Sequence, residues 1–216
     1  MKNSAFADKH PWSEPWYKVE GGNIWVLVFL SLIHFLSIVG LILYPLPNWE
    51  VFLTAFVFTC LGGLGTTLAY HRGLSHRALK LNPILEQILV FFAVFNGSGA
   101  PSTWVANHRN HHAKSDTIED VSSPRHGGFW WAHMRWLYQW RASSMERWCP
   151  DLIKTRYLFW AKIQIPLVIV SLSFGYLLFD WPGFFWIGAI RLTYSVHGQS
   201  VVNSILHLKP GLPEGV

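Results

Sequence analysis

The sequence predicts an all-α membrane protein, with four transmembrane helices and a cytoplasmic helical cap. Its composition is the first indication: 51% of the residues are hydrophobic and 13% are charged, whereas soluble domains carry about 25% charged residues. The apolar residues gather in long runs, and many of the histidines gather in the polar segment between those runs. The 13 tryptophans fit the same class, because tryptophan prefers the bilayer interface.

Four apolar runs are long enough to cross a bilayer as helices. A helix rises about 1.5 Å per residue and must span a hydrocarbon core of about 30 Å. The runs cover 23–44, 49–70, 162–179 and 184–208, and "PLPN" and "DWPG" separate the members of each pair. A further apolar run, 83–95, is too short, so an in-plane or core helix is expected there. Residues 23–208 should thus form one transmembrane domain, between an N-terminal segment 1–22 and a tail 209–216.

The distribution of Lys and Arg predicts the orientation. The segment 72–158 contains eleven of them, and the short turns 45–49 and 180–183 contain none. The positive-inside rule then places both termini and segment 72–158 in the cytoplasm of a multi-pass protein. It also accounts for the net charge of +5 without a nucleic-acid partner. Arg191, inside the last run, is expected to face protein or water rather than lipid.

The histidine pattern predicts a metal site on the cytoplasmic side. "HRGLSH" follows the second run, and "NHRNHH" places three histidines at helical positions i, i+3 and i+4, which share one face. Asn203 and His207 are spaced i, i+4 near the end of the last run. Imidazole suits iron, copper, zinc and nickel, and six rings exceed what one tetrahedral zinc needs, so two metal ions are expected. The candidate histidines are His71, His76, His108, His111, His112 and His207.

The other histidines are interpreted differently. His34, alone in the first run, is expected to be a packed or interfacial residue, and His133 to anchor helix packing. His10 and His126 are typical of loops. His197 is expected to line the site without binding metal. Two remote cysteines, Cys60 and Cys149, make a disulfide framework or a cysteine-rich zinc site improbable.

At these motifs the chain resembles the membrane fatty-acid desaturases, in particular the delta-9 acyl-CoA and acyl-lipid type. The matching segments are, in order, "HRGLSHRALKLNPILEQIL", "WVANHRNHH", "SDTIEDVSSPRHGGFWWAHMRW" and "VNSILH", and the likeness runs from about residue 50 to 208. The resemblance implies that two ferrous ions are held by the six candidate histidines, with Asn203 acting through water. It also implies that the histidine boxes lie in the cytoplasmic cap.

The resemblance further implies an oxygen-dependent desaturase that introduces a cis double bond into a saturated acyl chain. The electrons would come from an external donor, ferredoxin or cytochrome b5. The substrate would be an acyl-lipid, an acyl-CoA or an acyl-carrier-protein ester drawn from the membrane. The residues expected to line the substrate site are Trp104, Asn107, His197, Gln199 and Ser200.

One departure from the family pattern concerns a third box, H-x-x-H-H, which relatives carry beyond the last span. The residues after His207, "LKPGLPEGV", contain no histidine. On this basis we expect a chain truncated before the third box, which alone would bind the metal pair poorly and be inactive. The alternatives are a related di-iron membrane hydroxylase or ketolase, and a non-catalytic truncated homologue.

Overall fold

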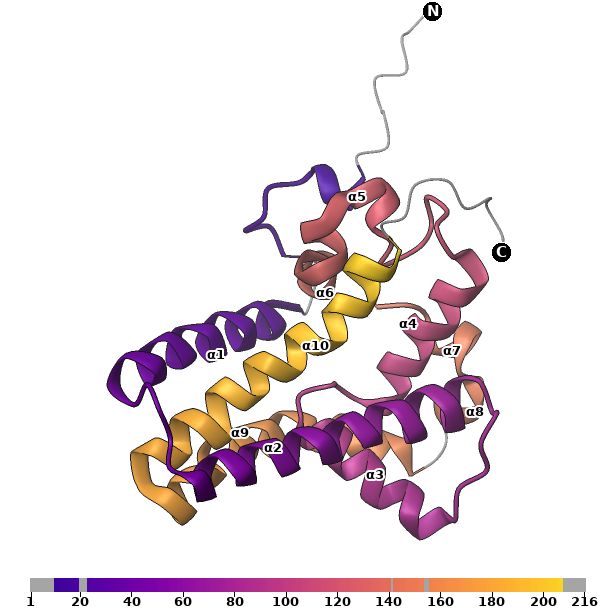
Figure 1. Cartoon of the computed structure of the whole chain (residues 1–216). Helices are drawn as coiled ribbons and strands as arrows, with labels where there is room; N and C mark the ends of the chain where they lie inside the picture. Colours follow the sequence, from indigo (N-terminus) through magenta and orange to yellow (C-terminus); the bar gives the residue numbers. More distant parts are fainter. Residues whose placement is uncertain (1–9, 20–22, 141, 154–155, 208–216) are drawn as a thin grey trace, which may run out of the picture.

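The computed structural model describes residues 10–19, 23–140, 142–153 and 156–207. The predicted tail 209–216 and much of the segment 1–22 lie outside the described residues. In the described ranges every regular element is helical, as predicted (Figure 1). The longer helices are α1 (Ile24–Leu43), α2 (Trp49–Leu64), α3 (Pro83–Phe95), α4 (Pro101–Lys114), α9 (Tyr157–Gly183) and α10 (Arg191–Leu206). The shorter ones are η1 (Pro11–Ser13), α5 (Pro124–Trp130), α6 (Trp136–Gln139), α7 (Met145–Trp148) and α8 (Pro150–Ile153), and π-helical segments occur at η3 (Gly65–Ser75), η4 (Trp131–Arg135) and η5 (Phe184–Ile190).

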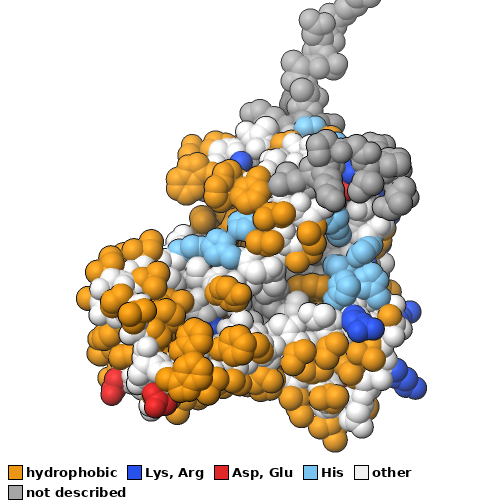
Figure 2. All heavy atoms as spheres, in the orientation of Figure 1, with side chains coloured by type: hydrophobic (Ala, Val, Ile, Leu, Met, Phe, Trp, Pro, Cys, Tyr) orange, Lys and Arg blue, Asp and Glu red, His pale blue; other side chains and the backbone are white. Residues whose placement is uncertain are grey.

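Three helical runs are long and apolar enough to cross a membrane. They are Ile24–Leu43, Trp49–Ser75 and Tyr157–Leu206, with 20, 27 and 50 residues. Large apolar side chains cover their outer faces, and Figure 2 shows these as broad hydrophobic areas over the lower part of the molecule. Soluble proteins rarely expose apolar patches of this extent, so these faces suit lipid. The short apolar run 83–95 forms α3, a helix of 13 residues, as expected for a segment that does not span.

The longest run folds back on itself. Phe179 and Asp180 have non-helical backbone angles, and Asp180 has a positive φ of 51°. The reversal thus begins one residue before the predicted turn at 180–183, and Pro182 lies just past the break, where a missing N–H is tolerated. Gly175 and Gly183 meet across the reversal: a Cβ on either would lie 2.1 Å from the other's carbonyl oxygen. Only glycine permits this approach.

Arg191 is buried inside the helix bundle, as the sequence predicted. It is 2% exposed. Its guanidinium donates to the backbone oxygen of Ile187 at 2.6 Å, to Asn96 Oδ1 at 2.5 Å and to Ser171 Oγ. These bonds join α10, α9 and the end of α3, and they satisfy a charge that lipid would not tolerate.

A hydrophobic core holds together the elements that carry the clustered histidines. Tyr70 from η3, Val90 and Val94 from α3, and Val105 from α4 are fully buried in one cluster. Tyr157 and Trp160 of α9 complete it. Because these helices share one core, the positions of η3 and α4 relative to each other are determined by packing.

Candidate metal centre

His71 and His76 are positioned by the π-helical end of the second long run. α2 continues without a break into η3, and the His76 N–H donates to the His71 carbonyl oxygen, five residues back, at 3.0 Å. The wider turn brings both rings to the same side, with centroids 4.5 Å apart. In an ordinary α-helix residues i and i+5 point in clearly different directions, so the π-helix is what pairs these histidines.

His108, His111 and His112 lie on α4, which begins at Pro101 with the proline in the first turn. The three rings do not converge together. His108 and His112, one helical turn apart, face the His71 and His76 pair, whereas His111 turns toward Asp120. The structure therefore divides the motif into two parts.

Four imidazoles converge on one small volume. A ligand nitrogen from each of His71, His76, His108 and His112 lies within 4.8 Å of the others. His108 Nε2 is the shared point, 3.1 Å from His76 Nε2 and 3.1 Å from His112 Nε2. Nitrogen lone pairs that aim at a common point are the donor set that binds a transition metal, and imidazole suits iron.

The surroundings of His108 keep its ring neutral, as a ligand must be. Burial, together with the neighbouring rings of His112 and His71, lowers the pKa of His108 to about 3. The Trp104 ring stacks on it with centroids 4.7 Å apart. Burial also lowers the pKa of His112. Neutral imidazoles need not lose a proton before binding metal, so the His108 and His112 rings are suited to it.

A second pair, His111 and His207, lies beside the four-ring cluster. Their ring centroids are 4.9 Å apart, and the His111 and His112 centroids are 5.5 Å apart. His111 Nδ1 lies 2.9 Å from both carboxylate oxygens of Asp120, and His207 Nδ1 lies 3.5 Å from Asp116 Oδ1. A carboxylate on Nδ1 orients the ring and leaves Nε2 available, which is the usual arrangement behind a metal-binding histidine.

Asp120 is nearly inaccessible and yet ionised. Burial alone would raise the pKa of its carboxyl. The hydrogen bond with His111, together with the backbone N–H groups of Ser122 and Asp116, outweighs burial and lowers that pKa. Asp116 and Asp120 were not among the site residues predicted from the sequence. Their position in "SDTIED", shortly after the histidines of α4, was the available signal.

Arg109 on α4 forms hydrogen bonds that hold η3, the other histidine-bearing element, in place. It donates to the backbone oxygens of Leu74 at 2.7 Å and Ser75 at 3.3 Å, at the end of η3. It also donates to Trp148 O and forms a two-point ion pair with Asp151. A single side chain on α4 thus ties down the segment that carries His71 and His76.

The residues predicted to line the substrate lie in two places. Trp104 and Asn107 are on α4, where Trp104 stacks on His108 and Asn107 Oδ1 accepts the Ser143 N–H at 2.9 Å. His197, Gln199 and Ser200 lie along α10. Asn203 is on the same helix, one turn before His207. Contact of these residues with a substrate stays a prediction.

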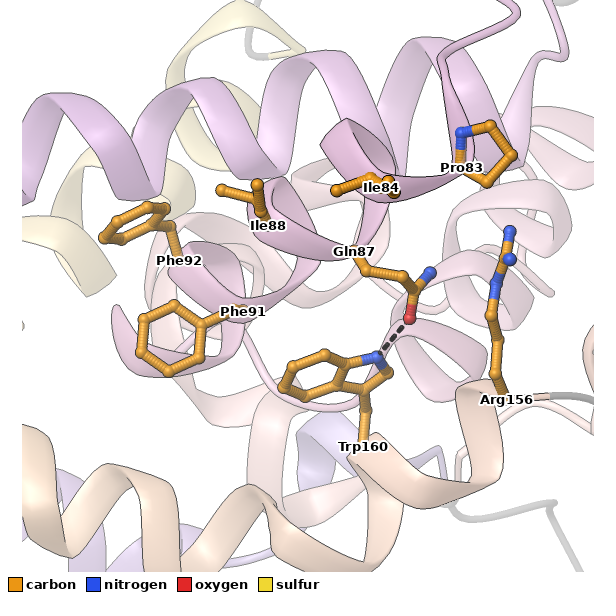
Figure 3. Close-up of a pocket in the computed structure, with 8 residues that line it drawn as sticks. All are labelled: Pro83, Ile84, Gln87, Ile88, Phe91, Phe92, Arg156 and Trp160. Carbon is orange, nitrogen blue, oxygen red and sulfur yellow. Dashed lines mark hydrogen bonds between the residues drawn. The ribbon is translucent and has the colours of Figure 1, made fainter.

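An open apolar groove lies on the other face of the core, away from the histidines. It runs between α3 and α9, with Phe91, Phe92 and Ile88 as its walls and Arg156 near one end (Figure 3). Trp160 Nε1 donates to Gln87 Oε1 across it at 2.8 Å. None of its lining residues belongs to the predicted site.

The chain is similar to known proteins over most of its length. Residues 47–213 match the family model described as fatty acid desaturase. The chain is 32% identical over 166 residues to a delta-9 acyl-lipid desaturase 2 of Arabidopsis thaliana, covering 74% of this chain and 54% of that protein. It is 32% identical to an acyl-CoA 5-desaturase of Anemone leveillei, covering 93% of this chain and 66% of that protein. An sn-1 stearoyl-lipid 9-desaturase of Synechocystis is 31% identical, with coverage of 84% and 58%. The chain thus spans about half to two thirds of the length of these relatives.

Proposed function

Because the chain belongs to the fatty acid desaturase family, we propose that it serves in the oxygen-dependent desaturation of a fatty acyl chain. The proposed reaction removes two hydrogens from adjacent carbons and leaves a cis double bond, at the delta-9 position. The observation that carries this proposal is the convergence of four imidazole nitrogens on one point. An unactivated methylene offers no acidic proton and no electrophilic carbon, so a side chain alone cannot attack it, and a metal is needed.

The proposed cofactor is a pair of ferrous ions. His71, His76, His108 and His112 would hold one, and His111 and His207, with Asn203 through water, would contribute to holding the other. Bound iron supplies the oxidising power with O₂ that side chains lack. The protein supplies the rest: Asp120 holds the His111 tautomer, Trp104 covers His108, and Arg109 keeps η3 and α4 in register.

The proposed membrane arrangement has four spans and a cytoplasmic cap. The reversal at Phe179 and Asp180 supports it, because it divides the longest apolar run into two antiparallel parts. The eleven Lys and Arg residues of 72–158 support the cytoplasmic side for the histidines and for both termini. An acyl substrate dissolved in the same bilayer would then meet the metal centre at the membrane surface.

We propose an acyl-lipid or an acyl-CoA as substrate, because the relatives are named as desaturases of these two kinds. An acyl-carrier-protein ester is the third carrier proposed. The electrons are proposed to come from ferredoxin or cytochrome b5.

The test combines metal content with product mass. The 216-residue chain, its His108→Ala variant and a His10→Ala control would be purified from an iron-replete host, and iron per chain measured. We expect iron in the wild type and the control and a large loss in His108→Ala, since His108 Nε2 is the shared point of the cluster. Equal iron in all three would refute the metal centre.

The same samples would then receive an acyl substrate, O₂ and a reductant system. A product lighter by two hydrogens supports the desaturase. A product heavier by one oxygen would indicate the hydroxylase or ketolase reaction instead. Iron binding without any product would favour a non-catalytic homologue.

A further inference from the structure

A second group of histidines lies outside the candidate metal centre. His197 on α10 contacts both His34 on α1 and His133 on η4, although the sequence suggested unrelated packing roles for His34 and His133. Figure 2 shows histidine side chains gathered in more than one place on this face. The three rings come from three elements that are distant in sequence, and His34 and His197 are 163 positions apart.

The geometry of this group differs from that of the metal centre. In the metal centre, two rings approach the same nitrogen of His108. Here the middle ring, His197, uses its two nitrogens on opposite partners: Nε2 lies 3.0 Å from His34 Nε2, and Nδ1 lies 2.9 Å from His133 Nε2. Nitrogens arranged in series do not point at one ion, but they can share protons.

Both ends of the series finish on oxygen atoms. His34 Nδ1 lies 2.6 Å from the Leu30 carbonyl oxygen, and His133 Nδ1 lies 2.8 Å from Ser204 Oγ. The Ser204 hydroxyl is also 2.9 Å from the Ser200 carbonyl oxygen. Five hydrogen-bonding contacts in a row therefore join α1 to α10.

A count of protons shows what this series can do. Each neutral imidazole has one N–H and serine has one O–H, so three neutral rings and Ser204 bring four protons to five contacts. If the Ser204 hydroxyl donates to His133, each ring donates its N–H to the next group in the direction of the Leu30 carbonyl. Four contacts then have a proton, and only the contact between Ser204 and the Ser200 carbonyl lacks one. One added proton fills all five contacts. If a proton then leaves at the other end, each ring has exchanged its N–H for the opposite tautomer.

Burial gives the series a direction. His34 and His197 are half-buried, whereas His133 is 6% exposed and Ser204 is fully buried. Burial lowers the pKa of His133, which disfavours an added proton on that ring.

The ring neighbours of His133 on α5, Phe129 and Trp130, carry no charge. The charged groups of the elements packed around the series are bound elsewhere: Arg125 to Asp116, Arg135 to Gln139 and Glu14 O, and Arg191 to Asn96, while the His126 ring meets Asp116 O.

We propose that His34, His197 and His133 form a proton relay that carries one exchangeable proton between the half-buried His34 and the buried Ser204. Ser204 lies one helical turn before His207. A use for the relay rests on the proposed function. There, one CH₂–CH₂ unit and one O₂ react with two electrons from an external one-electron donor and two protons, and the products are one double bond and two waters. The relay would hold one of these two protons on the α10 side of that site.

The relay is tested first by nuclear magnetic resonance on the full 216-residue chain with ¹⁵N-labelled histidine in lipid nanodiscs. Scalar coupling across the two N–H···N bonds is expected, between the Nε2 atoms of His34 and His197 and between His197 Nδ1 and His133 Nε2. On acidification, the three rings should take up one proton together before any takes up a second. In His197→Gln, which can form hydrogen bonds but cannot pass a proton, both couplings should vanish and the two remaining rings should titrate independently.

Absence of the couplings in the wild type, with three independent titrations, would overturn the relay. So would a Zn²⁺ titration in which all three rings bind the ion in place of their shared protons, because the group would then be a metal site. His10→Gln is the control, and it should leave couplings and titration unchanged.

A second measurement tests the use of the relay. His197→Gln should retain the wild-type iron content but lose roughly tenfold or more in turnover, with a larger solvent deuterium isotope effect. Unchanged turnover and isotope effect would show that the relay does not feed the reaction. If the wild type forms no product at all, the couplings still decide the relay, independently of the proposed function.

Discussion

His111 Nδ1 lies 2.9 Å from both carboxylate oxygens of Asp120, and this contact separates His111 from the four rings that converge beside it. The carboxylate is buried and receives backbone N–H groups of Asp116 and Ser122 as well. The ring is therefore held in one tautomer, beside the His207 ring.

Replacing Asp120 tests this arrangement. Asp120→Asn keeps the shape of the side chain but removes the charge, so His111 should lose its fixed tautomer. Loss of such a supporting carboxylate typically costs 10–100-fold in metal affinity, and a decrease of that size is expected in an iron or cobalt titration. Glu119→Gln is the matched control, because Glu119 is an exposed neighbour paired with Lys114. Equal affinities of the two variants would contradict the role of Asp120.

The hydrogen bonds of Arg109 predict that replacing Arg109 lowers the stability of the fold much more than replacing Arg77. Arg109→Gln removes donors to Leu74 O, Ser75 O, Trp148 O and Asp151, and each unsatisfied partly buried group costs about 1–3 kcal/mol. Arg77→Gln removes an exposed ion pair with the same Asp151, which is worth about 0–1 kcal/mol. Thermal unfolding in detergent should show a much lower midpoint for Arg109→Gln. Similar midpoints would mean that Arg109 does not hold η3 to α4.

Acid should weaken the ion pair between Arg109 and Asp151. The hydrogen bond from Arg109, aided by Arg77 and opposed by partial burial, lowers the pKa of Asp151 to about 2. In the unfolded chain an aspartate has a pKa of about 3.9. The folded pKa is the lower one, so the stabilisation is complete above about pH 4 and is lost as the pH falls toward about 2. Unfolding measured across this range should show a shallower loss of stability in Asp151→Asn. An identical acid dependence would show that Asp151 does not contribute to it.

Two glycine variants should change stability in opposite directions. At Gly175 an added Cβ meets the Gly183 carbonyl oxygen at 2.1 Å, so Gly175→Ala must push the two helical parts apart. Overpacking of this kind costs about 1–3 kcal/mol or more. At Gly63 on α2 an added Cβ has no neighbour within 4 Å among the described residues, so Gly63→Ala should stabilise the helix by about 0.5–1 kcal/mol. Denaturation of both variants in detergent measures the difference, and a stable Gly175→Ala would argue against the close reversal.

The membrane orientation is tested by reporter fusions. Asn48 caps α2 at its start, and Lys114 ends α4 in the histidine-bearing segment. With four spans and cytoplasmic termini, reporters at these two positions should lie on opposite sides of the membrane. Signals from the same side would refute the proposed arrangement.

The features that the sequence by itself determined depend on residues close together in the chain. The apolar runs 23–44 and 49–70 indicated the helices that form as α1 and α2, because helix formation and lipid compatibility depend on consecutive residues. The i, i+4 spacing of His108 and His112 likewise placed both rings on one side of α4. The burial of Arg191 was predictable from its place in an apolar run, since lipid does not solvate a guanidinium.

Only the tertiary structure decided which histidines meet, and in what geometry. The π-helical turn that pairs His71 with His76 has no clear sequence signature. The roles of Asp120 and Arg109 were visible only in the structure, which places Asp120 beside His111 and Arg109 beside the backbone of Leu74. His34 and His197 are 163 residues apart, and helical periodicity is silent about contacts at that separation. The difference between nitrogens that converge on His108 and nitrogens that run in series through His197 is set by the packing of whole helices against one another. That packing depends on the shapes of many side chains at once, and no short stretch of sequence contains it.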